Sequence, residues 1–196
     1  MKKITIILLV AFLSVSAYSQ EFQVNPFASF HMGGKLNGYD KDLKFENGVN
    51  FGLGLSRGFQ GKNIEVSYTH FLTDAVLQFK NGDEDSRSSA HMGYIQIGLV
   101  QDFQTGNGKV LPFFLISTGA TYLKISSIGG SSWSFSMATG GGLKYFFNDA
   151  VGLRIQARFL LPMYFNGYCG YGYCNGSYRA IPQGDFTGGL VFRILN

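Results

Sequence analysis

Charged side chains are scarce in this sequence. Asp, Glu, Lys and Arg make up 14% of the 196 residues, whereas a soluble single domain typically has about 25%. Removal of Lys2 and Lys3 with the N-terminal segment described below would leave 14 basic against 12 acidic residues. So small an excess lacks the basic footprint of a nucleic-acid-binding protein, and we expect no nucleic-acid partner.

A hydrophobic run long enough to span a membrane is also missing. Residues 4–15 are apolar but fall short of the roughly 20 residues of a membrane helix. Lys2 and Lys3 precede this run, and the small residues Ala17 and Ser19 follow it. This pattern predicts a cleaved signal peptide, residues 1–19, and a single exported domain, residues 20–196. An uncleaved anchor helix is the alternative.

Motifs for metal binding and catalysis are few. Cys169 and Cys174 are the only cysteines, and a structural zinc site needs about four ligands. His31, His70 and His91 lack metal-ligand spacing, which favours separate histidines near the outer rim over a metal cluster. The sequence contains no Gly-x-Ser-x-Gly motif. We therefore expect no metal, no cofactor and no enzymatic activity.

Aromatic residues and glycine are abundant, and apolar and polar residues alternate along most of the chain. The alternation is clearest in residues 151–159, where Leu153 and Ile155 oppose Arg154 and Gln156. Segments of this kind, separated by turn residues, predict strands that cross a membrane as a barrel. The fifth is apolar on both faces, so its register stays open. The eight segments are approximately 22–32, 48–59, 64–79, 90–104, 110–124, 133–147, 151–165 and 185–195.

The connections between these segments alternate between long and short. This predicts an all-β fold: an eight-stranded antiparallel up-and-down transmembrane β-barrel with short periplasmic turns and long outer loops. A soluble barrel also alternates, but its polar face points into water and carries many Lys and Glu residues. Here the polar faces carry mostly Gly, Ser, Asn, Gln and Thr. That composition suits the narrow lumen of a membrane barrel.

A few charged residues lie on these polar faces, and all but one fall near the predicted periplasmic end. Opposite charges from different strands could meet across the lumen as a salt-bridge network. The network could line a gated polar pore or form a structural plug. The plug is favoured because an eight-stranded barrel is only wide enough for its side chains to fill it. The predicted lumen charges are Glu65, Asp102, Lys144, Arg154, Arg193 and, away from that end, Arg158.

Two stretches resemble a known family. Residues 140–159, "GGGLKYFFNDAVGLRIQARF", resemble a strand–turn–strand unit of the small outer-membrane barrels of the opacity-protein and porin-like superfamily. The end of the chain, "TGGLVFRI", is similar to the signal read by the outer-membrane assembly machinery, with matches at Thr187, Gly189, Phe192 and Ile194. Many such proteins end on an aromatic residue, whereas this chain ends Leu195-Asn196.

The resemblance implies a monomeric protein in the outer membrane of a Gram-negative bacterium. Its partners would be outer-membrane lipid, lipopolysaccharide, the assembly machinery and an unidentified extracellular ligand. Because this fold hosts many activities, three roles stay open. One is a structural or adhesin-like barrel that acts through its outer loops, and another is a narrow channel for small solutes. A lipid-modifying enzyme is less well supported, because lipid A deacylases of similar fold use a His in the last strands and no His follows His91.

The stretch 166–178, "NGYCGYGYCNGSY", is expected to form the last outer loop. Thiols pair in an exported protein, so we predict a disulfide between Cys169 and Cys174. Tyrosines give large contact area at little entropy cost, so they could form a binding surface. Packing on the barrel rim is the other interpretation. The tyrosines concerned are Tyr168, Tyr171, Tyr173 and Tyr178.

Overall fold

The computed structural model describes residues 21–37, 41–59, 62–79, 86–106, 108–125, 131–170 and 173–194. The predicted signal peptide lies outside these ranges and stays a prediction. In the part of the chain that is described, no helix has the length and apolar character needed to cross a membrane.

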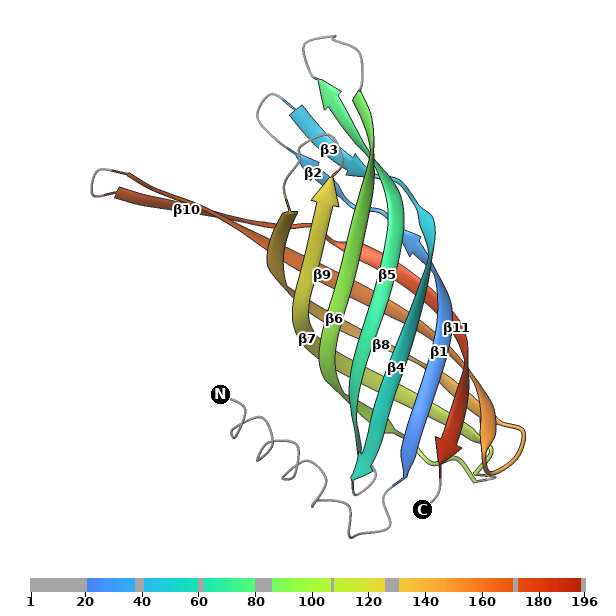
Figure 1. Cartoon of the computed structure of the whole chain (residues 1–196). Coiled ribbons are helices and arrows are strands. Elements are labelled where there is room, and N and C mark those ends of the chain that lie inside the picture. Colours follow the sequence, from blue (N-terminus) through green and yellow to red (C-terminus); the bar gives the residue numbers. More distant parts are fainter. Residues whose placement is uncertain are drawn as a thin grey trace, which may run out of the picture.

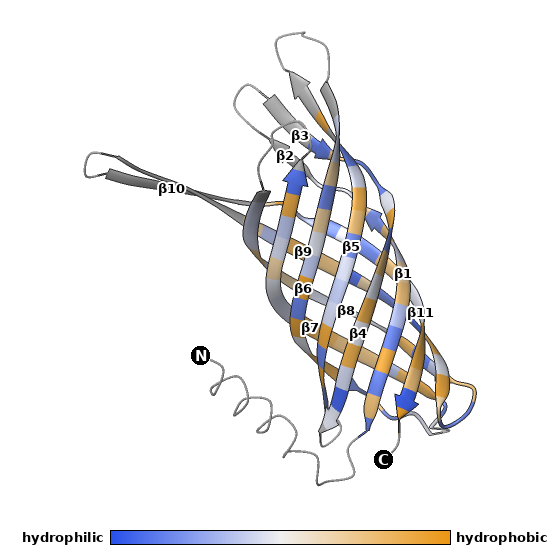
Figure 2. Cartoon of the chain, viewed as in Figure 1, coloured by the Kyte–Doolittle hydropathy of each residue, from blue (hydrophilic) through white to orange (hydrophobic). Residues whose placement is uncertain are grey.

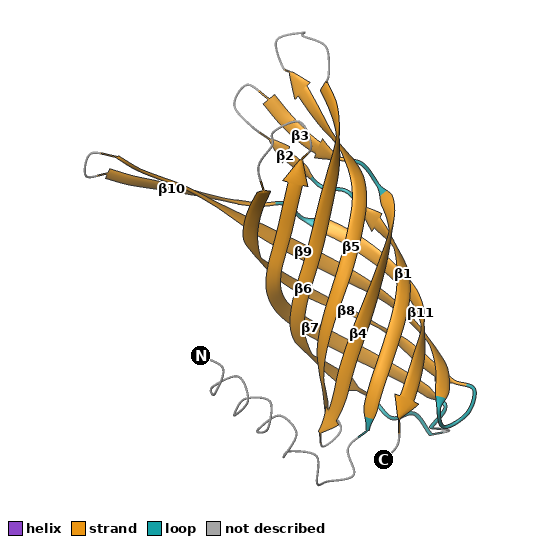
Figure 3. Ribbon diagram, in the orientation of Figure 1, coloured by secondary structure: helices purple, strands orange, loops and turns teal. Residues whose placement is uncertain are grey.

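The described residues form one closed antiparallel barrel (Figures 1 and 3). Eight of their strands make the barrel, in the order β1, β4, β5, β6, β7, β8, β9, β11, and β11 pairs with β1 to close it. The predicted eight-stranded barrel is therefore confirmed. The barrel strands are β1 (Phe22–Met32), β4 (Gly48–Phe59), β5 (Lys62–Phe79), β6 (Ser86–Asp102), β7 (Val110–Ile125), β8 (Ser131–Phe146), β9 (Val151–Gly170) and β11 (Gln183–Ile194).

The two ends of the barrel differ. At the end called here the turn end, Phe22 at the start of β1 pairs with Ile194 at the finish of β11. The connection from β8 to β9 lies at the same end, and its Asn148 explains the tightness of the turn. The Asn148 Oδ1 atom accepts hydrogen bonds from the backbone N–H groups of Ala150 at 2.9 Å and Val151 at 2.7 Å. This side chain replaces a backbone acceptor and reverses the chain within four residues.

At the opposite end, called here the hairpin end, three further strands extend the sheet. Strands β2 (Lys35–Asn37) and β3 (Lys41–Phe45) pair with each other, and β3 also pairs with the far part of β5. Strand β10 (Tyr173–Ala180) pairs with the far part of β9. The sequence prediction of a loop over 166–178 was therefore wrong for the backbone outside 171–172. Residues 166–170 and 173–178 pair as two antiparallel strands, and such backbone pairing leaves no trace in the apolar pattern.

Hydrophilic and hydrophobic residues alternate along the barrel strands (Figure 2), and burial follows the predicted alternation. On β9, Arg154, Gln156 and Arg158 are buried in the lumen, while Leu153 and Ile155 are exposed on the outer surface. The register of β7, which the sequence left open, is also settled. Its lumen side carries Leu111, Phe113 and Leu115, and its outer side carries Phe114 and Ile116.

The outer surface carries a continuous band of large apolar side chains. Exposed Val, Leu, Ile and Phe residues follow one another around the barrel on β4, β5, β6, β7, β9 and β11, for example Phe51 at 66% and Phe186 at 58% exposure. So large an apolar surface is unstable in water, whereas hydrocarbon solvates it at no cost. The closed barrel also leaves no unpaired strand edge along this band, as a membrane-spanning structure requires. The barrel is therefore built to span a lipid bilayer.

Candidate functional site: a network of paired charges in the lumen

The centre of the candidate site is an ion pair that crosses the lumen. The Arg154 guanidinium on β9 forms a two-pronged contact with the Glu65 carboxylate on β5, and Nη2 lies 3.1 Å from Oε1. Arg154 also donates from Nε to Gln156 Oε1 at 3.0 Å, and its Cζ atom lies 4.6 Å from the centre of the Phe113 ring. Two carboxylate oxygens, an amide oxygen and an aromatic face thus replace the water that the guanidinium loses on burial.

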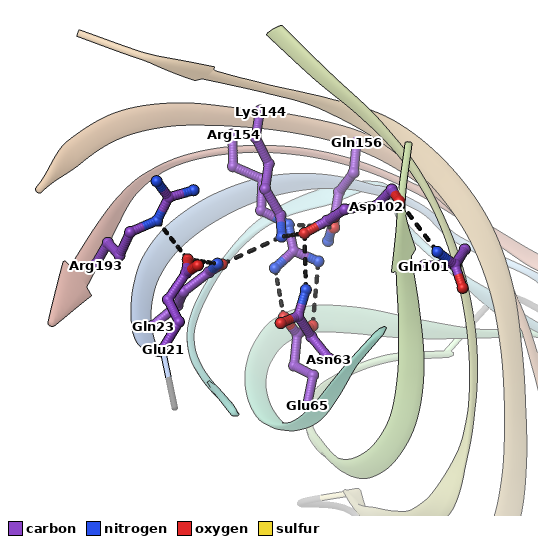
Figure 4. Close-up of polar contacts among 10 residues, drawn as sticks. All are labelled: Glu21, Gln23, Asn63, Glu65, Gln101, Asp102, Lys144, Arg154, Gln156 and Arg193. Carbon is purple, nitrogen blue, oxygen red and sulfur yellow. Dashed lines mark hydrogen bonds and ion pairs between the residues drawn. The ribbon is translucent and has the colours of Figure 1, made fainter. Parts of the chain in front are cut away.

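A second chain of contacts runs beside this pair toward the turn end (Figure 4). Lys144 Nζ on β8 lies 2.9 Å from Asp102 Oδ2 on β6, and the same oxygen accepts from Asn63 Nδ2 at 2.7 Å. Lys144 also donates to Gln23 Oε1 at 3.2 Å. Three strands that are far apart in sequence are therefore linked through one ammonium group.

Arg193 joins this chain through a residue that the sequence analysis missed. Its guanidinium pairs with Glu21, and Gln23 Nε2 donates to Glu21 Oε1 at 2.5 Å. Arg193 Cζ also lies 3.9 Å from the centre of the Phe146 ring. Glu21 directly precedes β1, where alternation gives no signal. The structure therefore connects Arg193 with Lys144 indirectly, through Glu21 and Gln23.

Arg158 has its own partner, also missed from sequence. Its Nη2 atom lies 2.9 Å from Asp185 Oδ2 on the neighbouring strand β11, and Thr187 donates to Asp185 Oδ1 at 2.5 Å. Arg158 and Asp185 are both buried. Asp185 could have been found by counting back in steps of two from Arg193 and Thr187, which share its face of β11. With this pair, each predicted lumen charge has an oppositely charged partner.

The hairpin end of the lumen is closed by an apolar group, called here the mouth cluster. Phe45 at the end of β3 and Ile181 between β10 and β11 are both 1% exposed and belong to this cluster. Backbone hydrogen bonds hold both in place, from Phe45 N to Gly34 O at 3.0 Å and from Ile181 N to Pro162 O at 3.1 Å. The mouth cluster comprises Phe45, Phe71, Ala90, Met92, Tyr94, Leu123, Ala138, Leu160 and Ile181.

The lumen is filled by its own side chains over the described residues. Arg154 and Lys144 are each 1% exposed and Tyr94 is 2% exposed. A continuous water-filled pore would leave such lining residues accessible. A cavity of about 10 Å³ lies beside Glu65, Ser67 and Arg158, which is room for about one water. The geometry thus supports a plug rather than an open pore.

The three histidines lie on two faces of the wall. His31 faces the lumen and is 1% exposed, whereas His70 and His91 lie outside on β5 and β6 with ring centres 6.2 Å apart. Tyr68 Oη lies 3.2 Å from His70 Nδ1, and Lys124 on β7 is the register partner of His91. Among the described residues, no group of three or more His, Cys, Asp or Glu side chains is placed to hold a metal.

Aromatic residues continue this outer surface onto β7 and β8, where the Tyr122 and Trp133 rings pack at a tilt with centres 5.1 Å apart. We call the whole set the rim patch: Tyr68, His70, His91, Tyr122, Lys124 and Trp133. A groove of about 370 Å³ lies beside it, and its lining includes Glu46, Asn47, Asp74, Ser89 and His91.

The remaining predicted residues are placed as follows. Cys169 and Cys174 are directly opposite each other in the β9–β10 backbone register. Their side chains lie outside the described ones, as do those of Tyr168, Tyr173 and Tyr178, and Tyr171 lies outside the described residues. On β11, Thr187 faces the lumen, whereas Phe192 and Ile194 face outward.

No protein-family model matches the sequence, and no curated protein matches it significantly. The structure is similar to the crystal structure of the outer membrane protein OprG from Pseudomonas aeruginosa, with a TM-score of 0.67 and 10% identity over 91% of this chain and 97% of that chain. It is also similar to the crystal structure of Neisserial surface protein A (NspA), with a TM-score of 0.62 and 15% identity over 88% and 97% of the two chains. The solution structure of Outer Membrane Protein W from E. coli is similar with a TM-score of 0.61. The two sequences are 13% identical over 91% of this chain and 100% of that chain.

At these identities the likeness shows the fold. The chain has the fold of the small outer-membrane β-barrels, so the resemblance seen in the sequence is confirmed at that level. The predicted outer-membrane location agrees with this fold and with the apolar band around the barrel.

Proposed function

We propose that this protein is a monomeric outer-membrane barrel of a Gram-negative bacterium, and that it acts as a structural or surface-interaction protein. The observation that carries this proposal is the burial of the paired lumen charges, with Arg154 and Lys144 each 1% exposed. A barrel that fills its own lumen offers no route for solutes at neutral pH. Its contacts with the environment must therefore be made at its ends and on its outer wall.

The hairpin end faces the outside of the cell in this proposal. Phe22 and Ile194, the first and last residues of the barrel strands, pair at the turn end. This end would face the periplasm, from which the barrel is assembled. The β2–β3 and β9–β10 hairpins then extend the barrel on the outer side. The tyrosines of the second hairpin and the groove beside His91 are the surfaces offered to an extracellular ligand.

The rim patch is proposed to meet lipid headgroups. Tyr122 and Trp133 have the amphipathic rings that favour a membrane interface. Lys124 can extend its ammonium group toward the phosphates of lipopolysaccharide while its aliphatic stem stays against the wall. Outer-membrane lipid and lipopolysaccharide are therefore the partners of the outer wall.

Assembly is proposed to depend on β11, the strand that closes the barrel. Thr187, Gly189, Phe192 and Ile194 would be read by the outer-membrane assembly machinery before β11 pairs with β1. The finished barrel has no unpaired edge along its wall, so it needs no second copy to complete the sheet.

Planar-bilayer recordings and binding measurements test this function. The purified protein is expected to show no single-channel steps at neutral pH, and regular steps would contradict the filled lumen. Cells that display the protein should bind a surface ligand in a glycan or matrix screen, and shortening the β9–β10 hairpin should abolish that binding. A deletion strain should keep its lipid A unchanged; altered lipid A would favour the enzyme hypothesis instead.

A further inference from the structure

His31 is a buried titratable residue of the lumen that takes no part in the ion pairs described above. It lies at the hairpin end of β1 and is 1% exposed. Neither ring nitrogen makes a hydrogen bond of ordinary geometry among the described residues, and the Gln183 side chain is the polar group that interacts with the ring. Its ring centre lies 4.4 Å from that of Phe71 and 6.0 Å from that of Tyr94, two members of the mouth cluster. His31 therefore supports the residues that close the lumen, without being tied to them by a polar contact.

The charges that face His31 come from β11, which pairs with β1, and from β9, the next strand of the wall. Asp185 on β11 is its register partner, and Asp185 is already paired with Arg158 on β9. On the other side, β4 places Gly48 opposite His31 and contributes no charge. Phe71 on β5 and Tyr94 on β6 contribute rings, and the Tyr94 hydroxyl donates to Gln183 Oε1 at 2.6 Å. The described surroundings of His31 therefore hold the balanced Arg158–Asp185 ion pair and no second carboxylate.

We propose that acidification opens the hairpin-end half of the lumen through protonation of His31. This second activity rests on the proposed function, because it requires a barrel that is closed at neutral pH. Above the titration range of the imidazole the ring is neutral and the mouth cluster stays packed. Below that range the ring is a cation, and the carboxylate that faces it among the described residues, Asp185, already neutralises Arg158.

A buried charge without its own partner is unstable unless water reaches it. Water would enter past Phe45 and Ile181, because both lie outside the eight strands of the barrel wall. Phe45 is the last residue of strand β3, and Ile181 lies between β10 and β11. Entry of water would hydrate the imidazolium and the unpartnered atoms nearby, which include both amide atoms of Asn50 and Nε2 of Gln183. The network around Lys144 would keep the turn end closed.

Hydrogen exchange measured by mass spectrometry on the whole protein in lipid nanodiscs tests this proposal. Exchange around residues 44–46 and 180–182 is compared at about pH 7.5 and about pH 4.5, a span that extends well below the ordinary histidine range. Rates are corrected for the intrinsic effect of pH. The wild-type protein should exchange several-fold faster in both segments at the lower pH.

The variants separate His31 from general effects of acid. His31→Gln removes the titration but keeps a polar side chain, and it should abolish the acid response. His70→Gln and His91→Gln lie on the outer wall and should respond as the wild type does. His31→Lys introduces a permanent charge and should open both segments already at neutral pH. Circular dichroism confirms that each variant retains the barrel.

Two results would overturn the proposal: no acid response in the wild type, or the same response in His31→Gln. Either result would leave the proposed function standing if the protein also shows no channel steps at neutral pH. Steps at neutral pH would instead contradict the proposed function itself, so the two failures are distinguishable.

Discussion

Arg154 on β9 and Glu65 on β5 meet across the lumen with two N–H···O contacts, one of which measures 3.1 Å. Arg154 is 1% exposed and Glu65 is 11% exposed, so neither charge has bulk water as an alternative partner. The pair therefore links opposite walls of the barrel. Its strength depends on both members being present.

Replacing Glu65 by Gln is expected to destabilise the barrel strongly. The change removes the negative charge and leaves the buried Arg154 guanidinium without its anionic partner. Such a loss typically lowers the free energy of unfolding by about 3–5 kcal/mol. Urea unfolding in lipid vesicles, followed by circular dichroism, measures the loss. Glu21→Gln is the matched control, since Glu21 is 32% and Arg193 18% exposed and the expected change is below about 1 kcal/mol. Equal losses in the two variants would refute the assigned role of the central pair.

The pair between Lys144 and Asp102 should behave differently when both members are removed together. Lys144→Met alone leaves the Asp102 carboxylate without its cation, with Asn63 Nδ2 still donating to it, and should destabilise the barrel. Adding Asp102→Leu removes the carboxylate that has lost its cation, so the double variant should recover much of the lost stability. Unfolding free energies of the two single variants and the double variant give the coupling energy. Additive losses would show that the two side chains act independently.

The glycines at 188 and 189 on β11 provide a paired test of packing at the closing seam. A Cβ atom on Gly189 would lie 2.5 Å from Pro26 O and 2.7 Å from Phe27 Cβ, whereas a Cβ atom on Gly188 would have no atom within 4 Å. Gly189→Ala should therefore slow or prevent closure of β11 on β1, and Gly188→Ala should be tolerated. Refolding into detergent micelles, assayed without assembly machinery, isolates this steric effect. A Gly189→Ala protein that refolds normally but fails to assemble in cells would place the effect in the assembly signal.

The sequence was sufficient to predict the wall of the barrel. The six charged residues that it assigned to the lumen each have an oppositely charged partner in the structure. Alternation with a period of two identifies which residues share a face, and this placed Glu65 and Arg154 in the lumen. It did not identify their pairing, because partners across a barrel depend on the stagger between strands. Alternation also failed for β7, where Phe113 and Phe114 are both apolar but only Phe113 packs in the lumen. Asp185 was missed because it stands near a strand start, where the pattern has not yet been established.

The apolar alternation could not predict the hairpins that extend beyond the barrel wall, for a different reason. Strands β2, β3 and β10 do not form part of the barrel wall, so their sequences need no apolar alternation. Their backbone pairing with β5 and β9 stabilises them instead. The sequence therefore predicts loops where the structure has hairpins.

Cys169 and Cys174 are expected to form a disulfide in the exported protein. They are register partners on β9 and β10, and directly opposed residues in an antiparallel pair have Cβ atoms about 4.5–5.5 Å apart. A disulfide needs about 3.5–4.5 Å, which a small adjustment of a two-stranded ribbon can provide. So short a ring should contribute about 2 kcal/mol to the stability of the hairpin. The hairpin would then present its tyrosines from a fixed backbone.

Mass spectrometry without reductant measures this bond directly, after alkylation of free thiols in the protein isolated from outer membranes. We expect no alkylation before reduction and two alkylated cysteines after it. Cys174→Ser provides the control, since it should leave Cys169 available to the alkylating reagent. Reduction should also increase hydrogen exchange over residues 166–178 while leaving β1 and β11 unchanged. Two free thiols in the untreated protein would refute the disulfide and leave the hairpin held by backbone pairing alone.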